Sequence, residues 1–132
     1  MIGIVVVTHG RIAEELVSAA RTIVGEVPAI TAVSIGWSDD PGAANEAIQR
    51  GLAEAGSAET LVLTDMFGGT PTNLSLPFLS EKVEIVTGVN LPMIIKACSL
   101  REGTLVEVAR AVREQGKGAI YVASEILERR GA

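Results

Sequence analysis

Short runs of aliphatic residues alternate with longer amphipathic stretches along the whole chain. The short runs are rich in Val, Ile and Leu and are bounded by turn or polar residues, a pattern typical of β-strands. Five runs are therefore expected to form strands: Ile2–Val7, Ile30–Ile35, Thr60–Thr64, Val83–Val86 and Ala119–Val122.

The longer stretches predict helices, because their apolar residues recur at intervals of three and four. The first helix follows the first strand and has the apolar face Ile12, Leu16, Ala19, Ile23 and Val27. The second begins at Asp39-Asp40-Pro41, where an acidic cap precedes a proline in the first turn. Its inward-facing residues are Ala44, Ile48 and Leu52.

Two further helices and a helical tail are expected. The third helix begins at Thr70-Pro71 by the same logic, and Pro77 is expected to shorten or kink it. The fourth helix stops near Gly116 and has the apolar face Leu105, Val108, Ala109 and Val112. The tail Ser124–Arg130 is expected to add a final helical turn or two.

Alternating strands and helices predict a three-layer α/β fold, in which helices cover both faces of a mostly parallel sheet. A flavodoxin-like strand order, 2-1-3-4 with the fifth strand at an edge, would put the first and third strands side by side. The loops that leave the carboxyl ends of strands at such a switch point form the natural binding site. No repeat or Pro/Ser-rich linker interrupts the chain, so residues 1–132 are interpreted as one domain.

Composition narrows the class of protein. Hydrophobic residues make up 48% of the chain but aromatic residues only 3%, which suits an aliphatic core beneath helices. The formal net charge of −5 argues against nucleic acid or an anionic membrane as the main partner. The single cysteine, Cys98, cannot form an internal disulfide, and the Met1–Val7 run is too short to span a membrane and lacks the basic start of a signal peptide. A cytoplasmic location is therefore expected.

His9 and Asp65 are the candidate catalytic pair. His9 follows the first strand and Asp65 follows the third, so the topology would bring both side chains into one crevice. An imidazole has a nucleophilic nitrogen only if its other nitrogen keeps the proton, and a carboxylate that accepts this N–H fixes the tautomer. The carboxylate also stabilises positive charge that develops on the ring. This chemistry predicts that His9 attacks phosphorus.

Groups around the pair are suited to bind a phosphoryl group. A helix that starts at Gly10 or Arg11 offers free backbone N–H groups and the positive end of its dipole. Gly68-Gly69 would let a second helix start approach closely, with the Thr70 hydroxyl as a further donor. Four more residues are expected to line the site: Thr8, Met66, Phe67 and Asn90.

Each of these residues also has a structural interpretation. Asp65 could cap a turn, Gly68-Gly69 could form a tight turn, and Asn90 could end the fourth strand. Trp37 is more typical of a loop residue that packs on the domain surface than of a substrate platform. The convergence of several such loops on one crevice nevertheless favours a functional site.

Several common site types lack their motifs. No G-x-x-x-x-G-K-[ST] or G-x-G-x-x-G pattern occurs, and Gly116-Lys117-Gly118 lacks the hydroxyl residue that a phosphate-binding loop needs. One histidine and one cysteine argue against a structural zinc site, and no G-x-S-x-G serine elbow is present. No cofactor or metal is expected, and the phosphoryl donor is expected to be another protein.

Three motifs in order closely resemble the IIA component of the mannose-type bacterial sugar phosphotransferase system. They are Val7-Thr8-His9-Gly10, Thr64-Asp65-Met66-Phe67-Gly68-Gly69-Thr70-Pro71-Thr72-Asn73 and Gly88-Val89-Asn90-Leu91-Pro92-Met93. The resemblance implies a phosphotransferase whose His9 takes phosphate from the phosphocarrier protein HPr and passes it to a separate IIB component. It also implies that Asp65 hydrogen-bonds to His9 and that Thr70 contacts the phosphoryl site.

The resemblance further implies a homodimer. In this family the last strand is exchanged antiparallel between subunits, which would place Ala119–Val122 on the neighbouring subunit. Contact with the membrane would occur only indirectly, through a permease complex.

Some features leave other functions open. Met66-Phe67 and Pro77 depart from the family pattern, and the phosphotransfer subunits that serve dihydroxyacetone kinase also carry a histidine after the first strand. The glycine-rich and Asn90 motifs fit the sugar-transport branch better. The alternatives are a regulatory protein whose His9 phosphorylation controls binding to a target, and a small-ligand-binding domain without phosphoryl chemistry.

Overall fold

The structure is a computed structural model that describes residues 1–131, with side chains to residue 127. Its sheet has four parallel strands in the order β2-β1-β3-β4, which confirms the predicted topology. The strands are β1 (Gly3–His9), β2 (Ile30–Ile35), β3 (Thr60–Thr64) and β4 (Val83–Thr87). β1 extends two residues beyond its predicted end, so His9 is its last residue rather than the second residue after it.

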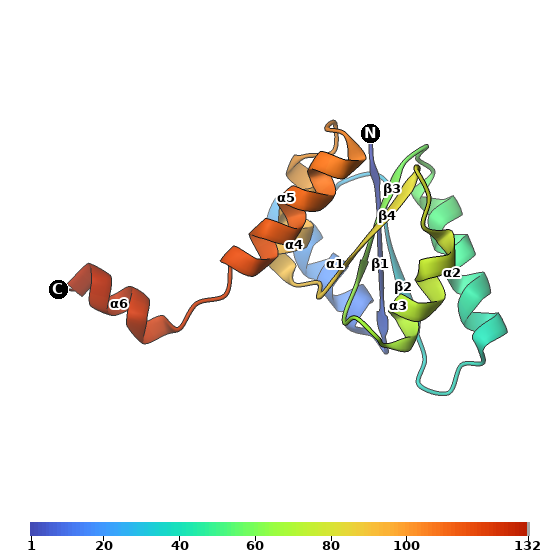
Figure 1. The fold of residues 1–132 in the computed structure, drawn as a ribbon, viewed down its shortest axis with the longest axis horizontal. Helices are drawn as coiled ribbons and strands as arrows, with labels where there is room; N and C mark the ends of the chain where they lie inside the picture. The colour runs from blue at the N-terminus through green and yellow to red at the C-terminus, as the bar shows by residue number, and fades with distance from the viewer. Residues whose placement is uncertain (132) are drawn as a thin grey trace.

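Helices cover both faces of the sheet, with α1, α4 and α5 on one face and α2 and α3 on the other (Figure 1). The helices are α1 (Ile12–Val24), α2 (Pro41–Ala55), α3 (Thr70–Ser75), α4 (Leu91–Ser99), α5 (Leu105–Gly118) and α6 (Ala123–Gly131).

The central strand β1 is buried from both sides. Ile4 and Val6 pack into the core shared with α1, α4 and α5, whereas Val5 and Val7 pack into the core beneath α2. All four side chains are at most 1% exposed. A strand with two covered faces needs an unbroken aliphatic run, which is the pattern seen at the start of this chain.

Local signals set several helix boundaries as predicted. The Asp40 carboxylate accepts a hydrogen bond from Ala43 N at 2.8 Å, and α2 begins at the following proline. α3 ends at Ser75 and continues as a single 3₁₀ turn, because Pro77 has no N–H to extend an α-helix. Pro77 therefore shortens the third helix, as expected.

The helix α4 is missing from the sequence-based prediction. Asn90 caps it, since its side-chain oxygen accepts a hydrogen bond from Met93 N at 3.1 Å. Met93, Ile94 and Ala97 are buried in the core that α4 shares with α1 and α5. The helix has only nine residues, and periodicity alone does not separate so short an apolar run from a buried strand.

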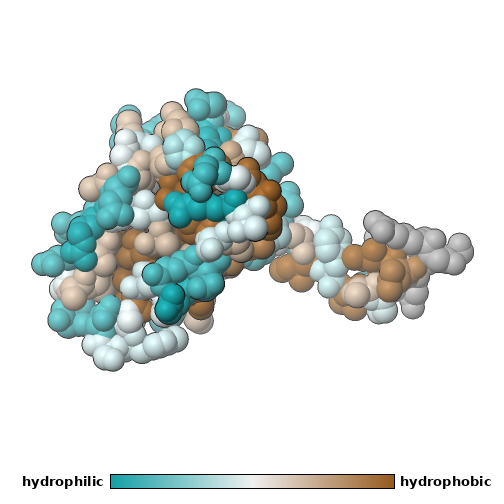
Figure 2. Space-filling view, turned by 180° about the vertical axis from the view of Figure 1, so that it is seen from behind, coloured by the Kyte–Doolittle hydropathy of each residue, from teal (hydrophilic) through white to brown (hydrophobic). Residues whose placement is uncertain are grey.

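The segment Ala119–Val122 does not pair as a strand within this single chain, and its expected exchange with a second subunit stays a prediction. It joins α5 to α6 and has no neighbouring strand in this chain, and a strand needs such a neighbour to satisfy its backbone N–H and C=O groups. Ile120, Tyr121 and Val122 are 76%, 68% and 59% exposed. The segment and α6 project from the α/β body, and apolar side chains are visible along them in Figure 2.

Candidate functional site

The parallel arrangement of β1 and β3 brings His9 and Asp65 together. In the register of the two strands Val7 is opposite Thr64, so the residues that follow leave the sheet at the same edge. His9 Nδ1 lies 2.7 Å from Asp65 Oδ2, although 56 residues separate the two in sequence. The convergence predicted from the strand order is confirmed.

The carboxylate of Asp65 is held by three groups. Its Oδ2 accepts the backbone N–H of His9 at 2.9 Å as well as contacting Nδ1, and its Oδ1 accepts the N–H of Met66 at 3.0 Å. With the proton on Nδ1 and donated to Asp65, the Nε2 lone pair of His9 is free. Both side chains are largely buried, at 18% and 14% exposure, which favours a fixed ring orientation.

The glycine-rich loop after β3 lies directly against the imidazole. A Cβ built on Gly69 would lie 2.7 Å from His9 Cε1 and 3.4 Å from Nε2, so only glycine leaves room for the ring. Gly68 has φ +86° and forms the turn before α3. Among the described residues, the backbone N–H groups of Gly68 and Thr70 have no protein acceptor.

Two hydroxyl groups hold this loop in shape. The Thr72 hydroxyl donates to Met66 O at 2.6 Å and lies 2.7 Å from the Thr64 hydroxyl, and both threonines are fully buried. Met66 and Phe67 point outward, at 56% and 76% exposure. The loop after β3 is therefore held on its buried side by the Thr72 hydroxyl, and its exposed side is apolar.

Trp37 is an exposed loop residue, as expected, but it also belongs to the site, a contact that the sequence did not predict. Its indole stacks on the imidazole of His9, with ring centroids 5.0 Å apart and an angle of 18° between planes. The only signal in the sequence was position, because Trp37 follows β2, the other neighbour of β1. Parallel strands end at a common edge, so this position alone could have placed it there.

Three other predicted residues have contacts that differ from their expected roles. Thr8 is fully buried, and its hydroxyl accepts the N–H of Ala13 at 2.7 Å near the start of α1. The N–H of Gly10 donates to Ile35 O at 2.8 Å, so it is not a free donor. Asn90 caps α4 and donates from its amide to Gly116 O at 3.3 Å.

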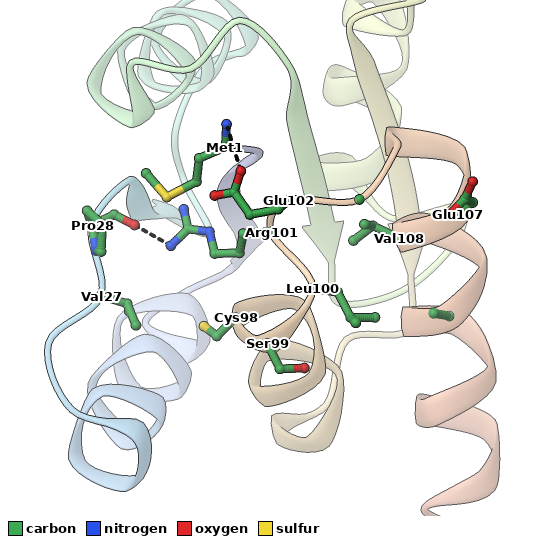
Figure 3. Close-up of a pocket in the computed structure, with 12 residues that line it drawn as sticks. Met1, Val27, Pro28, Cys98, Ser99, Leu100, Arg101, Glu102, Glu107 and Val108 are labelled. Atoms are coloured by element: carbon green, nitrogen blue, oxygen red, sulfur yellow. Dashed lines mark hydrogen bonds and ion pairs between the residues drawn. The ribbon is translucent and has the colours of Figure 1, made fainter.

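A cavity of about 630 Å³ lies away from this pair, between the chain start and the α4–α5 loop (Figure 3). Arg101 is 6% exposed there and donates to the carbonyls of Ile2, Pro28 and Ala29. Burial lowers the pKa of Arg101, and it raises the pKa of the Cys98 thiol, an effect that Arg101 partly opposes. The contacts of Arg101 tie the loop to the sheet, so we interpret it as a structural clamp.

The described side chains, those of residues 1–127, include no group of three or more His, Cys, Asp and Glu placed to hold a metal ion. None of the helices described between residues 1 and 131 has the length and hydropathy needed to cross a bilayer.

The fold and the pair together define an α/β domain with a carboxylate-oriented histidine at the carboxyl edge of its sheet. The sequence matches the family of the PTS system fructose IIA component over residues 3–112. The chain therefore belongs to this family of phosphotransferase-system IIA components, and the resemblance drawn from its motifs is confirmed.

Individual relatives agree with this assignment. The chain is 29% identical to the PTS system fructose-specific EIIA component of Bacillus subtilis, over 98% of this chain and 91% of that protein. It is 33% identical to the PTS system mannose-specific EIIAB component of Escherichia coli, over 76% of this chain but 32% of that longer protein.

Solved structures share the whole fold. The phosphotransferase system component EIIA from Streptococcus agalactiae superposes with a TM-score of 0.84 at 26% identity, covering 95% of this chain and 99% of that one. The mannose/sorbose specific IIA subunit from Enterococcus faecalis also gives 0.84, at 31% identity and with 92% and 93% of the two chains covered.

Proposed function

We propose that the protein carries a phosphoryl group on Nε2 of His9, taking it from HPr and passing it to a IIB component. The observation that supports this most directly is the 2.7 Å contact between His9 Nδ1 and Asp65 Oδ2, which leaves Nε2 as the free nucleophile. Family membership supports a phosphotransferase-system role for the chain as a whole.

The proposed transfer needs no metal or cofactor on this chain. The lone pair of His9 Nε2 forms the new N–P bond, and the electron pair of the N–P bond that breaks leaves with the histidine of the donor. The proton stays on Nδ1, so the imidazole ring gains positive charge. Asp65 stabilises that charge through its short hydrogen bond, as a carboxylate does for an imidazolium in other enzymes.

Donors for the phosphoryl oxygens are available beside the ring. The free N–H groups of Gly68 and Thr70 and the exposed Thr70 hydroxyl lie in the loop that contacts His9 through Gly69. We propose that these groups bind the phosphoryl oxygens, since backbone N–H groups orient well toward anions. The exposed apolar surface of Met66 and Phe67 would contact the donor and acceptor proteins.

A phosphorylation assay tests the proposal. Incubation with phosphoenolpyruvate, enzyme I and HPr should add one acid-labile, base-stable phosphate to the wild-type protein and none to His9→Gln. Because His9 is the only histidine, any equal labelling of the variant would place the phosphate on another residue and end the proposal.

The variant Asp65→Asn tests the role of the carboxylate. It keeps the size of the side chain but removes the charge, and a hydrogen bond to a charged group contributes about 1.5–3 kcal/mol. We expect transfer about ten- to hundredfold slower with unchanged folding. Glu54→Gln, which removes the charge of an exposed carboxylate near the end of α2, is the matched control and should transfer at the wild-type rate.

We also propose a homodimer in which the exposed segment at residues 119–122 pairs with the free edge of β4 in a second copy. A groove of about 540 Å³ runs beside β4 and is lined by apolar side chains that include Leu76, Leu79, Ile85 and Val106. The exposure of Ile120, Tyr121 and Val122 supports this arrangement, because isolated chains rarely expose such a run. Sedimentation of the full chain and of a chain ending at Gly118 should give a dimer and a monomer, respectively; a full-length monomer would disprove it.

A further inference from the structure

We propose that Trp37 is a positioning residue for His9, whose indole face stabilises the positive charge that the imidazole gains on phosphorylation. The inference rests on the proposed phosphorylation of His9. It adds a third residue to the site, beside Asp65 and the glycine-rich loop. In this proposal the group that the indole stabilises is the phosphorylated imidazole of His9.

The stacked geometry is built into the fold rather than left to a free side chain. The Trp37 loop is closed by Gly36 N donating to Asp39 Oδ2 at 2.8 Å and by Asp39 N donating to Gly36 O at 3.2 Å. Its start is tied to the end of β1, because Gly10 N donates to Ile35 O at 2.8 Å. These bonds hold the loop beside the imidazole.

Gly10 makes space for the indole. It adopts φ +53°, and a Cβ built there would lie 3.2 Å from Trp37 Nε1, closer than most side-chain contacts. A larger residue would push the indole away from His9. Gly10 therefore accommodates the stacked ring of Trp37. Its N–H is bonded to Ile35 O and is not a donor to the site.

Burial does not explain the position of Trp37. The residue is 80% exposed, in a chain whose aromatic content is only 3%. A tryptophan placed for core packing would be mostly buried. The main described aromatic contact of Trp37 is instead with the ring of His9.

The charge balance of the reaction gives the indole a role. When Nε2 bonds phosphorus and Nδ1 keeps its proton, the ring becomes an N-phosphorylated imidazolium. The face of an indole attracts such a cation through its quadrupole, and Trp is the strongest side chain for this interaction. Asp65 acts in the plane of the ring through Nδ1, whereas Trp37 acts on its face, so their effects should be separable.

The expected effect is modest and measurable. Cation–π contacts at exposed sites correspond to about a two- to fivefold change in an equilibrium constant. Trp37→Leu should lower the equilibrium of phosphorylation by about this factor, because leucine keeps apolar cover without a π face. Trp37→Phe retains a weaker π face and should fall between leucine and tryptophan.

The test uses potassium phosphoramidate, which phosphorylates imidazoles without a protein donor, on the full-length protein. The equilibrium labelling of the wild type, Trp37→Phe and Trp37→Leu is compared, with Ile23→Ala as a control at an exposed apolar site near the far end of α1. The ring protons of His9 are followed by NMR in the unphosphorylated proteins, because the indole ring current should shift them in the wild type and not in Trp37→Leu.

The outcomes separate this inference from the proposed function. The order wild type, phenylalanine, leucine, with Ile23→Ala equal to wild type, supports the role of Trp37. Equal labelling of all four proteins, or equal losses in both Trp37 variants, overturns it while leaving the phosphorylation of His9 intact. Absence of label from every protein, or labelling of His9→Gln equal to that of the wild type, overturns both.

Discussion

The contact between Gly69 and His9 allows a sharp prediction about a single methyl group. Gly69 has φ −81° and ψ 163°, which an alanine adopts without backbone strain. The added Cβ, however, would lie 2.7 Å from His9 Cε1. The substitution Gly69→Ala therefore perturbs mainly the position of the imidazole, since the other side chain it approaches, the exposed Met66, lies farther away at 3.3 Å.

The size of the effect follows from the geometry. Carbon atoms in contact prefer a separation of about 3.5–4.0 Å, so the ring must move by about 0.8 Å. A displacement of this size directed away from Asp65 would lengthen the 2.7 Å contact with Asp65 Oδ2 to at most about 3.5 Å, where a hydrogen bond is essentially lost. Losing a bond to a charged group costs about 1.5–3 kcal/mol, which corresponds to transfer about ten- to hundredfold slower.

The assay is the rate at which label passes from phosphorylated HPr to the protein, with the midpoint of urea unfolding measured in parallel. Gly118→Ala is the matched control, because a Cβ at that position meets no atom within 4 Å. We expect slow transfer and a near-normal unfolding midpoint for Gly69→Ala only. A wild-type rate in a folded Gly69→Ala protein would show that the orientation of His9 does not limit transfer.

Three further predictions concern stability. Arg101→Met should lower the free energy of unfolding by roughly 2–4 kcal/mol, because three carbonyls lose their donor, and should leave phosphorylation unchanged. Asp40→Ala should lower it by about 1 kcal/mol through loss of the α2 cap, whereas Asp40→Ser should restore most of this in the same urea titration. Burial raises the pKa of the Cys98 thiol, so the unfolded chain loses this proton at a lower pH than the folded protein does. The free energy of unfolding should therefore fall as pH rises through the alkaline range. Cys98→Ser should flatten that fall, and an unchanged slope would refute the linkage.

Much of the fold could be predicted because its elements are encoded by local signals. The aliphatic runs that became β1, β2, β3 and β4 are buried on a sheet covered by helices, so each needs an uninterrupted apolar stretch. The start of α2 depends on Asp40 and Pro41, and the end of α3 on Pro77, all of which act within a few residues.

The state of two elements depends on distant partners, so local sequence patterns do not decide it. α4 is a short apolar run of nine residues, which periodicity alone does not separate from a buried strand, and its packing against α1 and α5 decides its state. The segment after α5 has the β-branched and aromatic residues of a strand, but the backbone of Ile120, Tyr121 and Val122 has no strand to pair with in one chain.

The sequence by itself determined the order of elements, the aliphatic core and the candidate residues His9, Asp65 and Gly69, because these follow from periodicity and from position at strand ends. Only the tertiary structure decided how these residues meet: which nitrogen of His9 faces Asp65, and that Gly69 lies against the ring. It also showed that the exposed Trp37 stacks on the imidazole and that Gly10 has no free N–H. Such contacts join three loops from separate strands, and their distances depend on the packing of the whole sheet rather than on any local pattern.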